Sequence, residues 1–424
     1  MSNMQSNNKV AVIGAGIIGI NCAIELQQRG YQVTLLDKTG IGQACSKGNA
    51  GHFATEQVFP MADAKLLTQL PKMLLDPLGP ISLSIKYLPK SLPWFMQFLA
   101  NMFNKQRLSN TKALRSLNER ALAYYQPLLQ AANAQHLFSQ NGSLLVFEHT
   151  ELTQITAIQQ SYLAQNVKVS LLTREQALML EPNLSPNIRY ALHFTDVGHT
   201  INPLVLSQCL ANYALSLGCQ FQQFDVNDII HHSNYVAVSD KQHTHKFDQI
   251  VIATGAWSTS ILAKLGYKLP LIAERGYSLD LNAQTLNKLS RPVASAERRF
   301  IITPMSHGLR LSGTAEFASL SQKPNMRRAT MLLQHAQHII QGLSSPTQPN
   351  ENAWMGCRPS LPDSLPVIGK APKHHNISLA LGHQHLGLTL GAITGKLIGQ
   401  IVSGQQTDVD ITPFCLTRFN KSLR

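Results

Sequence analysis

Three glycines near the start of the chain, Gly14, Gly16 and Gly19, stand in a G-x-G-x-x-G pattern, and Asp37 follows 18 positions after the last of them. The first glycine permits a tight turn, the second lets backbone approach a pyrophosphate, and the third lets a helix pack against a strand. Free N–H groups at the start of that helix attract phosphates. Asp37 can accept hydrogen bonds from a ribose 2′-OH and would repel a 2′-phosphate, which argues against NADP. The pattern predicts a dinucleotide site, and a glycine-rich turn without a ligand is the alternative.

Two further segments favour a flavin dinucleotide over NAD. The run VIATGAW leads from a buried strand into a turn at Thr254 and Gly255, ahead of Trp257, where small residues let backbone pass close to the adenosine half of the cofactor. Residues 382–387, GHQHLG, supply a second anchor at a helix start, far from that half. Reduced flavin carries negative charge around its pyrimidine ring, so helix N–H groups aimed there favour reduction.

The elements that position these motifs are readable from hydrophobic periodicity. Residues 9–13, 17–30 and 31–36 predict a strand, a helix and a strand, which is a complete βαβ unit. Residues 63–129 are helical in pattern but punctuated by prolines, which predicts a cap of short helices. Further strands are expected at 142–147, 190–194, 247–253, 277–281, 299–304, 310–314 and 377–381, and further helices at 151–165, 203–218 and 386–403.

This order predicts an α/β fold with a Rossmann-type FAD-binding domain and a discontinuous second domain, built on an antiparallel or mixed sheet with helices. We expect residues 1–62, 190–262 and 350–424 to form the FAD-binding domain, and residues 63–189 and 263–349 to form the substrate domain.

Composition narrows the class of protein. Hydrophobic residues make up 44% of the 424 residues and charged residues 14%, which is typical of a globular chain. The net charge of +13 attracts anions, but the absence of a basic run, a zinc-finger spacing or an RNP-like string argues against nucleic acid. Six cysteines without a CxxC pair, and an amino terminus without a signal peptide, predict a cytoplasmic protein.

Nine motifs, taken in order, resemble the D-amino-acid oxidase superfamily of FAD enzymes, and its D-amino-acid dehydrogenase branch in particular. The resemblance covers nearly the whole chain. The motifs are GAGIIG, SKGNAGH (46–52), GSLLVF, DVGHTINP (196–203), VIATGAWS, RGYSLDL (275–281), LSGTAEF (311–317), GCRPSLPDSLPVIG (356–369) and GHQHLGLTLGAITG (382–395).

The resemblance and the motifs together predict a set of residues that bind FAD, with the segment Asn49–Gly51 running along the flavin. Cys357 lies one residue away from the position where some relatives tether the cofactor, so we expect non-covalent FAD. The predicted cofactor-binding residues are Gly14, Gly16, Ile17, Ile18, Gly19, Asp37, Lys38, Ser46, Asn49, Ala50, Gly51, Thr254, Gly255, Trp257, Gly382, His383, Leu386, Gly387, Leu388 and Thr389.

Three residues are predicted to contact substrate. In the resembling family the arginine of the RP motif, here Arg358, binds the substrate carboxylate, a role suited to a planar guanidinium with parallel donors. Tyr277 matches a substrate-facing tyrosine of several relatives, with plain strand packing as the alternative. His52 contacts the flavin or substrate, or is a surface or core histidine. His383 and His385 lack a third ligand at sensible spacing, so no metal site is predicted.

The predicted reaction is FAD-dependent oxidative deamination of a small amino acid in catabolism, most readily a D-amino acid including D-proline or hydroxyproline. Hydride would pass from the α-carbon to flavin N5, with water then releasing keto acid and ammonia, or leaving a ring imine from a cyclic substrate. The alternatives are a glycine or sarcosine oxidase that produces hydrogen peroxide, a tRNA-modifying flavoprotein, and an FAD-binding subunit of a heteromeric dehydrogenase.

The acceptor of the electrons is predicted from the branch and from one segment. Dehydrogenases of the resembling branch feed the respiratory chain, so a quinone or another respiratory acceptor is expected. Residues 66–103 are basic, broken by proline and rich in Leu, Met, Trp and Phe. This composition suits peripheral contact with the inner face of the cell membrane. A helical lid over the substrate domain is the alternative.

Overall fold

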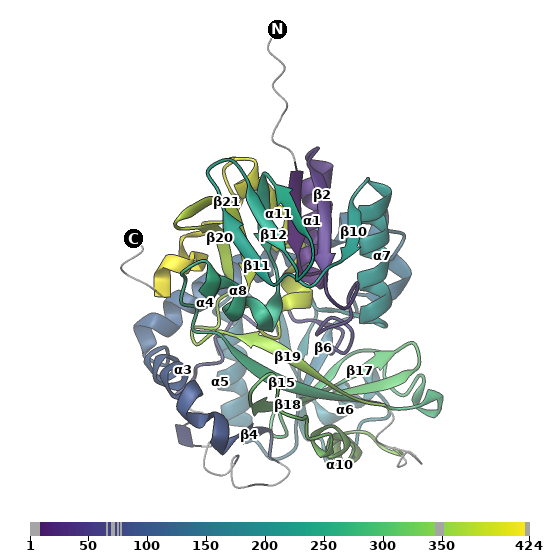
Figure 1. Cartoon of the computed structure of the whole chain (residues 1–424). Helices are drawn as coiled ribbons and strands as arrows, with labels where there is room; N and C mark the ends of the chain where they lie inside the picture. The colour runs from purple at the N-terminus through teal and green to yellow at the C-terminus, as the bar shows by residue number, and fades with distance from the viewer. Residues whose placement is uncertain are drawn as a thin grey trace.

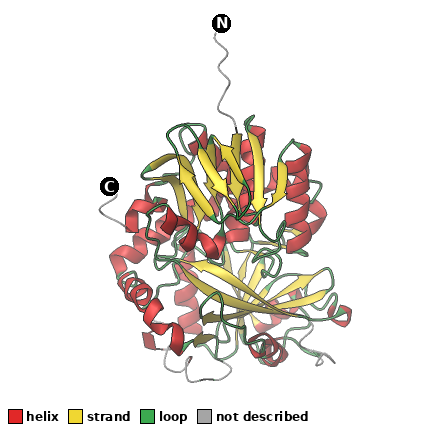
Figure 2. Ribbon diagram, viewed as in Figure 1, coloured by secondary structure: helices red, strands yellow, loops and turns green. Residues whose placement is uncertain are grey.

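The computed structural model describes residues 9–64, 67–68, 73, 76, 79–343 and 352–419. Two large sheets form its framework, one above the other in the view, and helices lie on their outer sides (Figures 1 and 2). The predicted α/β class and the opening βαβ unit are confirmed.

The first sheet has six strands and contains the βαβ unit. All neighbours are parallel except the last pair. In spatial order its strands are β10 (Gln220–Gln223), β2 (Gln32–Asp37), β1 (Lys9–Ile13), β14 (Gln249–Ile252), β21 (His374–Leu381) and β20 (Val367–Ala371).

Each face of this sheet is covered by a different layer. In β1, Val10 and Val12 belong to one hydrophobic cluster, whereas Ala11 and Ile13 belong to another, as the two-residue period of a strand requires. The first cluster is completed by α1 (Ile17–Gln28), α7 (Pro203–Ser216) and α11 (Gly387–Val402). The second includes residues of a three-stranded antiparallel sheet made of β11 (Asp228–His231), β12 (Val236–Ser239) and β13 (Thr244–Phe247), and of α8 (Ser258–Lys264).

The second sheet has nine strands and is mixed. Its long central strands are antiparallel, and β4 (Ile81–Leu83) pairs in parallel with one of them. The other strands, in spatial order, are β19 (Ala353–Ser360), β15 (Ile272–Asp280), β18 (Gly308–Phe317), β17 (Phe300–Met305), β16 (Val293–Ser295), β6 (Ser143–Phe147), β8 (Tyr190–Phe194) and β7 (Val169–Thr173).

The helices beside the second sheet include α3 and α4, which Figure 1 shows on one flank of the molecule. Their bounds, with those of the other helices here, are α3 (Leu88–Ala100), α4 (Asn104–Ala131), α5 (Leu152–Leu163), α6 (Arg174–Leu180), α9 (Arg327–Thr330) and α10 (Leu332–Ile339). A small sheet joins the two halves through β3 (His52–Phe53), β9 (Gly198–Thr200) and β5 (Phe138–Ser139). Short 3₁₀ helices lie at Ile85–Tyr87, Gln135–Leu137, Gly255–Trp257, Ala283–Thr285, Thr412–Phe414 and Leu416–Phe419.

The prediction that residues 63–129 form only short helices is wrong for α4, which runs for 28 residues. The prolines of this region lie before Trp94 and at Pro127, so the chain between them carries none that would interrupt a helix.

Sheet membership also bears on the domain boundaries. Both β8 and β19 are strands of the second sheet, whereas the sequence-based division places residues 190–194 and 353–360 in the FAD-binding domain. The division into two domains stays a prediction.

Candidate active site

The predicted phosphate-binding turn lies between β1 and α1. Gly14 has φ +108°, and a Cβ there would meet the carbonyl oxygen of Ala253 at 2.4 Å. A Cβ on Gly19 would lie 1.8 Å from the Gly14 oxygen. Asp37 accepts a 2.9 Å hydrogen bond from the Ala15 N–H, which fixes its carboxylate beside the turn. Glycine is therefore required at both positions for the strand, turn and helix to meet.

The helix that begins at the second predicted anchor, α11, runs parallel to α1. Along α11, Gly391, Gly395 and Gly399 are spaced by four residues, and Cβ atoms there would meet α1 at Ile17 and Asn21, at Asn21, and at Glu25 and Arg29 respectively. Residue numbers therefore increase in the same direction along both helices. Because their dipoles point the same way, both helices direct free N–H groups and partial positive charge toward the same end of the sheet.

A loop of residues 45–51 crosses in front of these helix starts. The Ile17 N–H donates to Ser46 Oγ at 2.9 Å, and Asn49 Oδ1 accepts from the Gly51 N–H at 2.7 Å. Arg310, buried on β18, donates to the Lys47 and Asn49 carbonyl oxygens at 3.2 and 3.0 Å. The loop is therefore held from both sides.

Arg310 is itself fixed by a bidentate ion pair with Asp280, in which Nε donates to Oδ1 at 2.6 Å and Nη2 donates to Oδ2 at 2.8 Å. Burial raises the pKa of Asp280, but hydrogen bonds from Arg310 and His307 outweigh it and hold the pKa at about 2. The carboxylate is charged at neutral pH, and the guanidinium keeps two donors for the loop.

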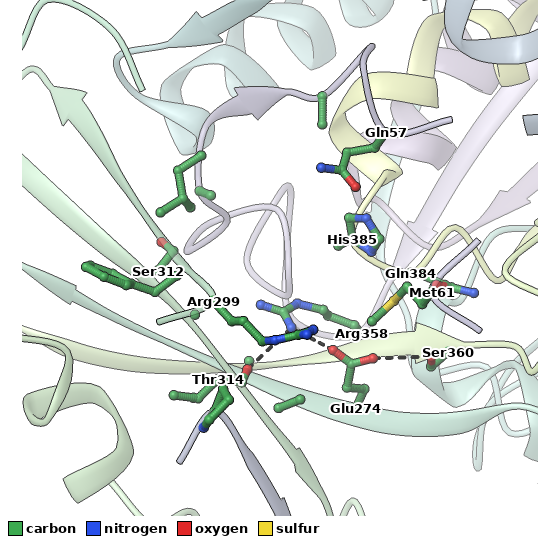
Figure 3. Close-up of a pocket in the computed structure, with 18 of the residues that line it drawn as sticks. Gln57, Met61, Glu274, Arg299, Ser312, Thr314, Arg358, Ser360, Gln384 and His385 are labelled. Atoms are coloured by element: carbon green, nitrogen blue, oxygen red, sulfur yellow. Dashed lines mark hydrogen bonds and ion pairs between the residues drawn. The ribbon is translucent and has the colours of Figure 1, made fainter. Parts of the chain in front are cut away.

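A cavity of about 770 Å³ opens between this loop, the helix starts and the second sheet (Figure 3). The predicted residues that line it are Ile17, Ser46, Asn49, Ala50, His52, Tyr277, Arg358, Gly387 and Leu388. The first residues of both α1 and α11 therefore border one space.

The other predicted cofactor residues lie outside this cavity. Lys38 Nζ sits 4.4 Å from the ring of Trp257, and Thr254 Oγ1 is 3.0 Å from Ser258 Oγ, beside the turn that follows β14. Thr389 accepts a hydrogen bond from the Ala54 N–H and so links α11 to the chain just after the loop of residues 45–51.

The side chain of Arg358 reaches the cavity from β19. Its Nη1 donates to Glu274 Oε1 at 2.7 Å, and Glu274 is buried on the neighbouring strand β15 (Figure 3). Ser360 Oγ donates to the other carboxylate oxygen at 3.3 Å. A Cβ on Gly276 would lie 2.3 Å from Arg358 Nη2, so the guanidinium lies across a glycine. The arginine is pre-oriented and keeps donors for a second anion.

The hydroxyl of Tyr277 hydrogen-bonds to other groups of the protein. It donates to Glu316 Oε2 at 2.6 Å and accepts from the Asn325 N–H at 3.2 Å. Burial and the hydrogen bond to Glu316 raise the pKa of Tyr277 to about 12. The ring borders the cavity, and a direct contact between this hydroxyl and substrate stays a prediction.

Four non-glycine residues in the left-handed region border the cavity, including Ser364 at φ +65° and Gln384 at φ +51°. Thr314 and Arg299 both have φ +55°, and the register of β15 on β18 shifts between Arg275 and Tyr277. A bulge turns side chains out of the regular alternation, and strained backbone of this kind is concentrated at functional sites. Burial lowers the pKa of Arg299, whereas nearby Asp63 raises it.

A third group of polar side chains meets the cavity around His52. Its Nε2 is 3.6 Å from Glu56 Oε1, beyond hydrogen-bonding distance, and both residues are nearly inaccessible. Burial lowers the pKa of His52 to about 4 and raises that of Glu56 to about 7. His199 pairs opposite His52 in the small sheet, and burial and His52 lower its pKa to about 4.

The two histidines near the carboxyl end face differently. His383 Nε2 is 2.9 Å from Thr394 Oγ1 of α11, and His383 does not border the cavity. His385 does, and burial lowers its pKa to about 4, with Glu274, Arg358 and His52 also acting on it. Within the described part of the chain, no three His, Cys, Asp or Glu side chains are grouped to hold a metal ion.

Sequence reasoning missed several cavity residues. Glu274 precedes a recognised motif and Glu56 follows one, but nothing in either residue's spacing predicts burial. The sequence marks His385 only as a possible metal ligand beside His383. The missed polar lining residues include Glu56, Gln57, Glu274, Arg299, Ser312, Thr314, Trp354, Ser360, Ser364, Gln384 and His385.

These residues fit FAD. The glycine turn, two parallel helix starts and a loop pinned against them border a space large enough for a tricyclic ring beside a small substrate. The loop residues Ser46, Asn49 and Ala50 and the α11 residues Gly387 and Leu388 would hold the flavin, and the turn after β1 would hold the pyrophosphate.

Comparison with known proteins gives the same result. Residues 9–401 match the family model described as FAD dependent oxidoreductase. A protein of Bradyrhizobium diazoefficiens named D-amino-acid oxidase is 32% identical, over 98% of this chain and 100% of that one. One of Allorhizobium ampelinum named D-amino acid dehydrogenase is 27% identical, over 97% and 98%.

Solved structures share the fold. Glycine oxidase from Geobacillus kaustophilus superposes with a TM-score of 0.74 at 22% identity, over 97% of this chain and 99% of that one. L-proline dehydrogenase from P. horikoshii gives 0.73 at 18% identity, over 98% and 99%. With the match over most of its length and a cavity shaped for the cofactor, the chain belongs to the family of FAD-dependent oxidoreductases.

Proposed function

We propose that this enzyme oxidises a small D-amino acid, including D-proline or its hydroxylated derivatives, at the carbon that bears the amine. The names of the relatives support the substrate class. The observation that carries the proposal is Arg358, a pre-oriented guanidinium inside the cavity that both helix starts border.

In this proposal the chain itself supplies orientation. Arg358 binds the substrate carboxylate through the N–H groups that Glu274 leaves available, and this fixes the α-carbon. Bound FAD supplies the acceptor for the hydride that leaves this carbon. The apolar walls of the cavity, Leu144, Leu145, Phe300 and Ile301, keep water away from the reacting carbon.

A matched panel of amino acids tests the proposal. Purified, FAD-saturated enzyme is mixed anaerobically with D- and L-isomers of alanine, proline and hydroxyproline, and bleaching of the flavin absorbance is followed. We expect rapid bleaching by D-isomers. Arg358→Ala should keep FAD and lose at least tenfold in apparent affinity for the substrate. Bleaching by no amino acid, or unchanged affinity in the variant, would reject the proposal.

The electron acceptor is proposed to be a membrane quinone, reached through an apolar face on α3. Leu92, Met96 and Leu99 of α3 are exposed large hydrophobic residues, as is Phe103 just after this helix, which is 73% exposed. Leu92 and Leu99 also border the cavity, so the apolar surface continues inward toward Arg358. Within the described residues no helix is long and apolar enough to cross a bilayer.

Charge around this face supports contact with an anionic bilayer. Residues 80–118 contain no Asp or Glu but six basic residues, Lys86, Lys90, Lys105, Arg107, Lys112 and Arg115. Lys86, Lys90 and Lys105 are exposed. Shallow insertion of apolar side chains flanked by lysines is how a peripheral protein attaches to acidic lipid.

An oxidase that passes electrons to oxygen is the second candidate, since the relative at 32% identity carries that name. The two are separated by reoxidation of the reduced enzyme. A quinone analogue that reoxidises it at least tenfold faster than air-saturated buffer supports a dehydrogenase, whereas stoichiometric hydrogen peroxide at a comparable rate supports an oxidase.

A further inference from the structure

The cavity contains a polar pair for which the proposed reaction has no use. Glu56 and His52 both border it, four residues apart in sequence, on and just after β3. Glu56 is 4% exposed. Neither Glu56 Oε2 nor His52 Nε2 has a hydrogen-bond partner among the described residues, although both atoms are buried.

Such atoms are costly to leave unpaired. A buried polar group without a partner loses its interaction with water and gains nothing in return. The 3.6 Å gap between His52 Nε2 and Glu56 Oε1 is too long for the two to satisfy each other. The Gln57 side chain hydrogen-bonds to the Glu56 carboxyl, but Glu56 Oε2 and His52 Nε2 still lack a partner among the described residues.

The pair lies apart from the carboxylate anchor. Arg358 is on β19 and is satisfied by Glu274, whereas His52 and Glu56 are on the segment that joins the two halves of the molecule. His385 lies between, since both Arg358 and His52 act on its pKa. The cavity therefore has two polar regions, one at Arg358 and Glu274 and one at His52 and Glu56, with His385 near both.

We propose that Glu56 and His52 form a subsite for a hydroxyl group on the side chain or ring of the substrate. This deepens the proposed amino acid oxidation and rests on it. A hydroxyl both donates and accepts, so one oxygen can serve two neighbouring groups. Near neutral pH His52 is uncharged and Glu56 is close to its own midpoint, so the pair suits a neutral partner better than an ammonium group.

The pair should therefore act as a selectivity filter. A site built to hydrogen-bond a substrate hydroxyl discriminates strongly against the analogue that lacks it, because the site's own groups are then left unpaired. The enzyme should prefer 4-hydroxy-D-proline of one epimer over D-proline, or D-serine over D-alanine, by at least tenfold in the ratio of reduction rate to dissociation constant.

Three variants test this in the FAD-saturated enzyme, each measured by anaerobic flavin reduction with the same substrate pairs. Glu56→Gln retains the shape but not the acid, and Glu56→Leu removes all hydrogen bonding. Glu175→Gln is the matched control, because Glu175 is exposed on α6 and does not border the cavity. We expect the preference to fall at least tenfold in Glu56→Leu, by less in Glu56→Gln, and not at all in the control.

Three results would overturn the subsite. A wild-type enzyme that reduces with D-proline and D-alanine as readily as with their hydroxylated partners rejects it whatever the variants do. A loss of rate shared equally by both members of each pair gives Glu56 a structural role. Several-fold weaker FAD binding with unchanged preference assigns the pair to the cofactor. If no amino acid bleaches the flavin at all, the proposed function itself fails.

Discussion

Glu274 and Arg358 stand directly opposite each other on β15 and β19, and their side chains form a 2.7 Å ion pair at the wall of the cavity. Glu274 is almost fully buried, whereas about a quarter of the Arg358 side chain is accessible. The Glu274 carboxylate thus binds the buried side of the guanidinium. The accessible side of the guanidinium faces the cavity, where a second carboxylate would bind.

This relationship predicts strong coupling between the two residues. Arg358→Ala alone leaves a buried carboxylate without its counter-charge, whereas Arg358→Ala with Glu274→Gln removes both charges together. We expect a coupling free energy of about 1–3 kcal/mol, measured by chemical unfolding of the four proteins of a double-mutant cycle. Additive losses of stability would mean that the pair contributes little to the fold.

Gly276→Ala displaces Arg358 without altering its chemistry. The added Cβ would lie 2.3 Å from Nη2 and 2.4 Å from Cζ of Arg358. The guanidinium has to move off Glu274, so we expect KM for the amino acid to rise at least tenfold while bound FAD per chain is unchanged. Arg358→Lys is the companion variant, since it keeps the charge but loses the planar fork. A normal KM in Gly276→Ala would show that this orientation of Arg358 is not the productive one.

Arg310→Lys should weaken FAD binding rather than substrate binding. Arg310 links Asp280 to two carbonyl oxygens of the loop at residues 47 and 49, and a lysine cannot span these partners. Because hydrogen bonds from charged donors contribute about 1.5–3 kcal/mol each, the dissociation constant for FAD should rise at least tenfold. Isothermal titration of the apoprotein with FAD measures the dissociation constant. An unchanged dissociation constant would mean that the loop does not help to bind the cofactor.

The flavin should be released completely by acid precipitation. A covalent tether needs a reactive thiolate, but burial raises the pKa of Cys357, whose Sγ contacts Met355 Sδ at 3.8 Å. Burial likewise raises the pKa of Cys45, which borders the cavity, to about 12. Yellow colour that stays in the pellet after trichloroacetic acid would contradict non-covalent binding.

Much of the fold was predictable because its signals are local. The glycine turn, α1 and β2 follow from spacing and periodicity, and the carboxyl-terminal β21 and α11 follow from an apolar run, a glycine and a helical pattern. The length of α4 was not, because the prolines before Trp94 and at Pro127 indicate breaks across the stretch up to residue 129, although none lies between them.

The candidate site likewise contains residues that the sequence predicts and residues that only the structure identifies. Arg358, the loop at 46–51 and the start of α11 lie within motifs, so sequence order sufficed to single them out. Glu274 became visible only through the cross-strand register of β15 on β19, and Glu56 only through burial. The ring of His383, a predicted cofactor-binding residue, contacts Thr394, whereas His385 borders the cavity, and the role of His383 stays a prediction. Which of two residues so close in sequence faces a cavity depends on backbone geometry that no local pattern specifies.

Glu56 should give the enzyme a distinctive dependence of stability on pH. Burial raises its pKa from 4.5 to about 7, so the folded state holds a proton that the unfolded state releases between these values. Its contribution to stability is fully present below pH 4.5 and is lost as pH rises through 7. The loss approaches about 3 kcal/mol, at 1.36 kcal/mol per pKa unit.

Groups that face Glu56 titrate too, and a matched variant separates them. His52 and His199, whose pKa values are lowered to about 4, stabilise the fold as pH rises, which is the opposite sign. Burial and Glu56 raise the pKa of Tyr162 beyond this range. Glu56→Gln keeps the histidines and removes the acid. The free energy of unfolding of wild type minus that of the variant should therefore fall from pH 4.5 to 7 and level off above it. A difference that is flat with pH would mean that Glu56 has the same pKa in the folded enzyme as in the unfolded chain.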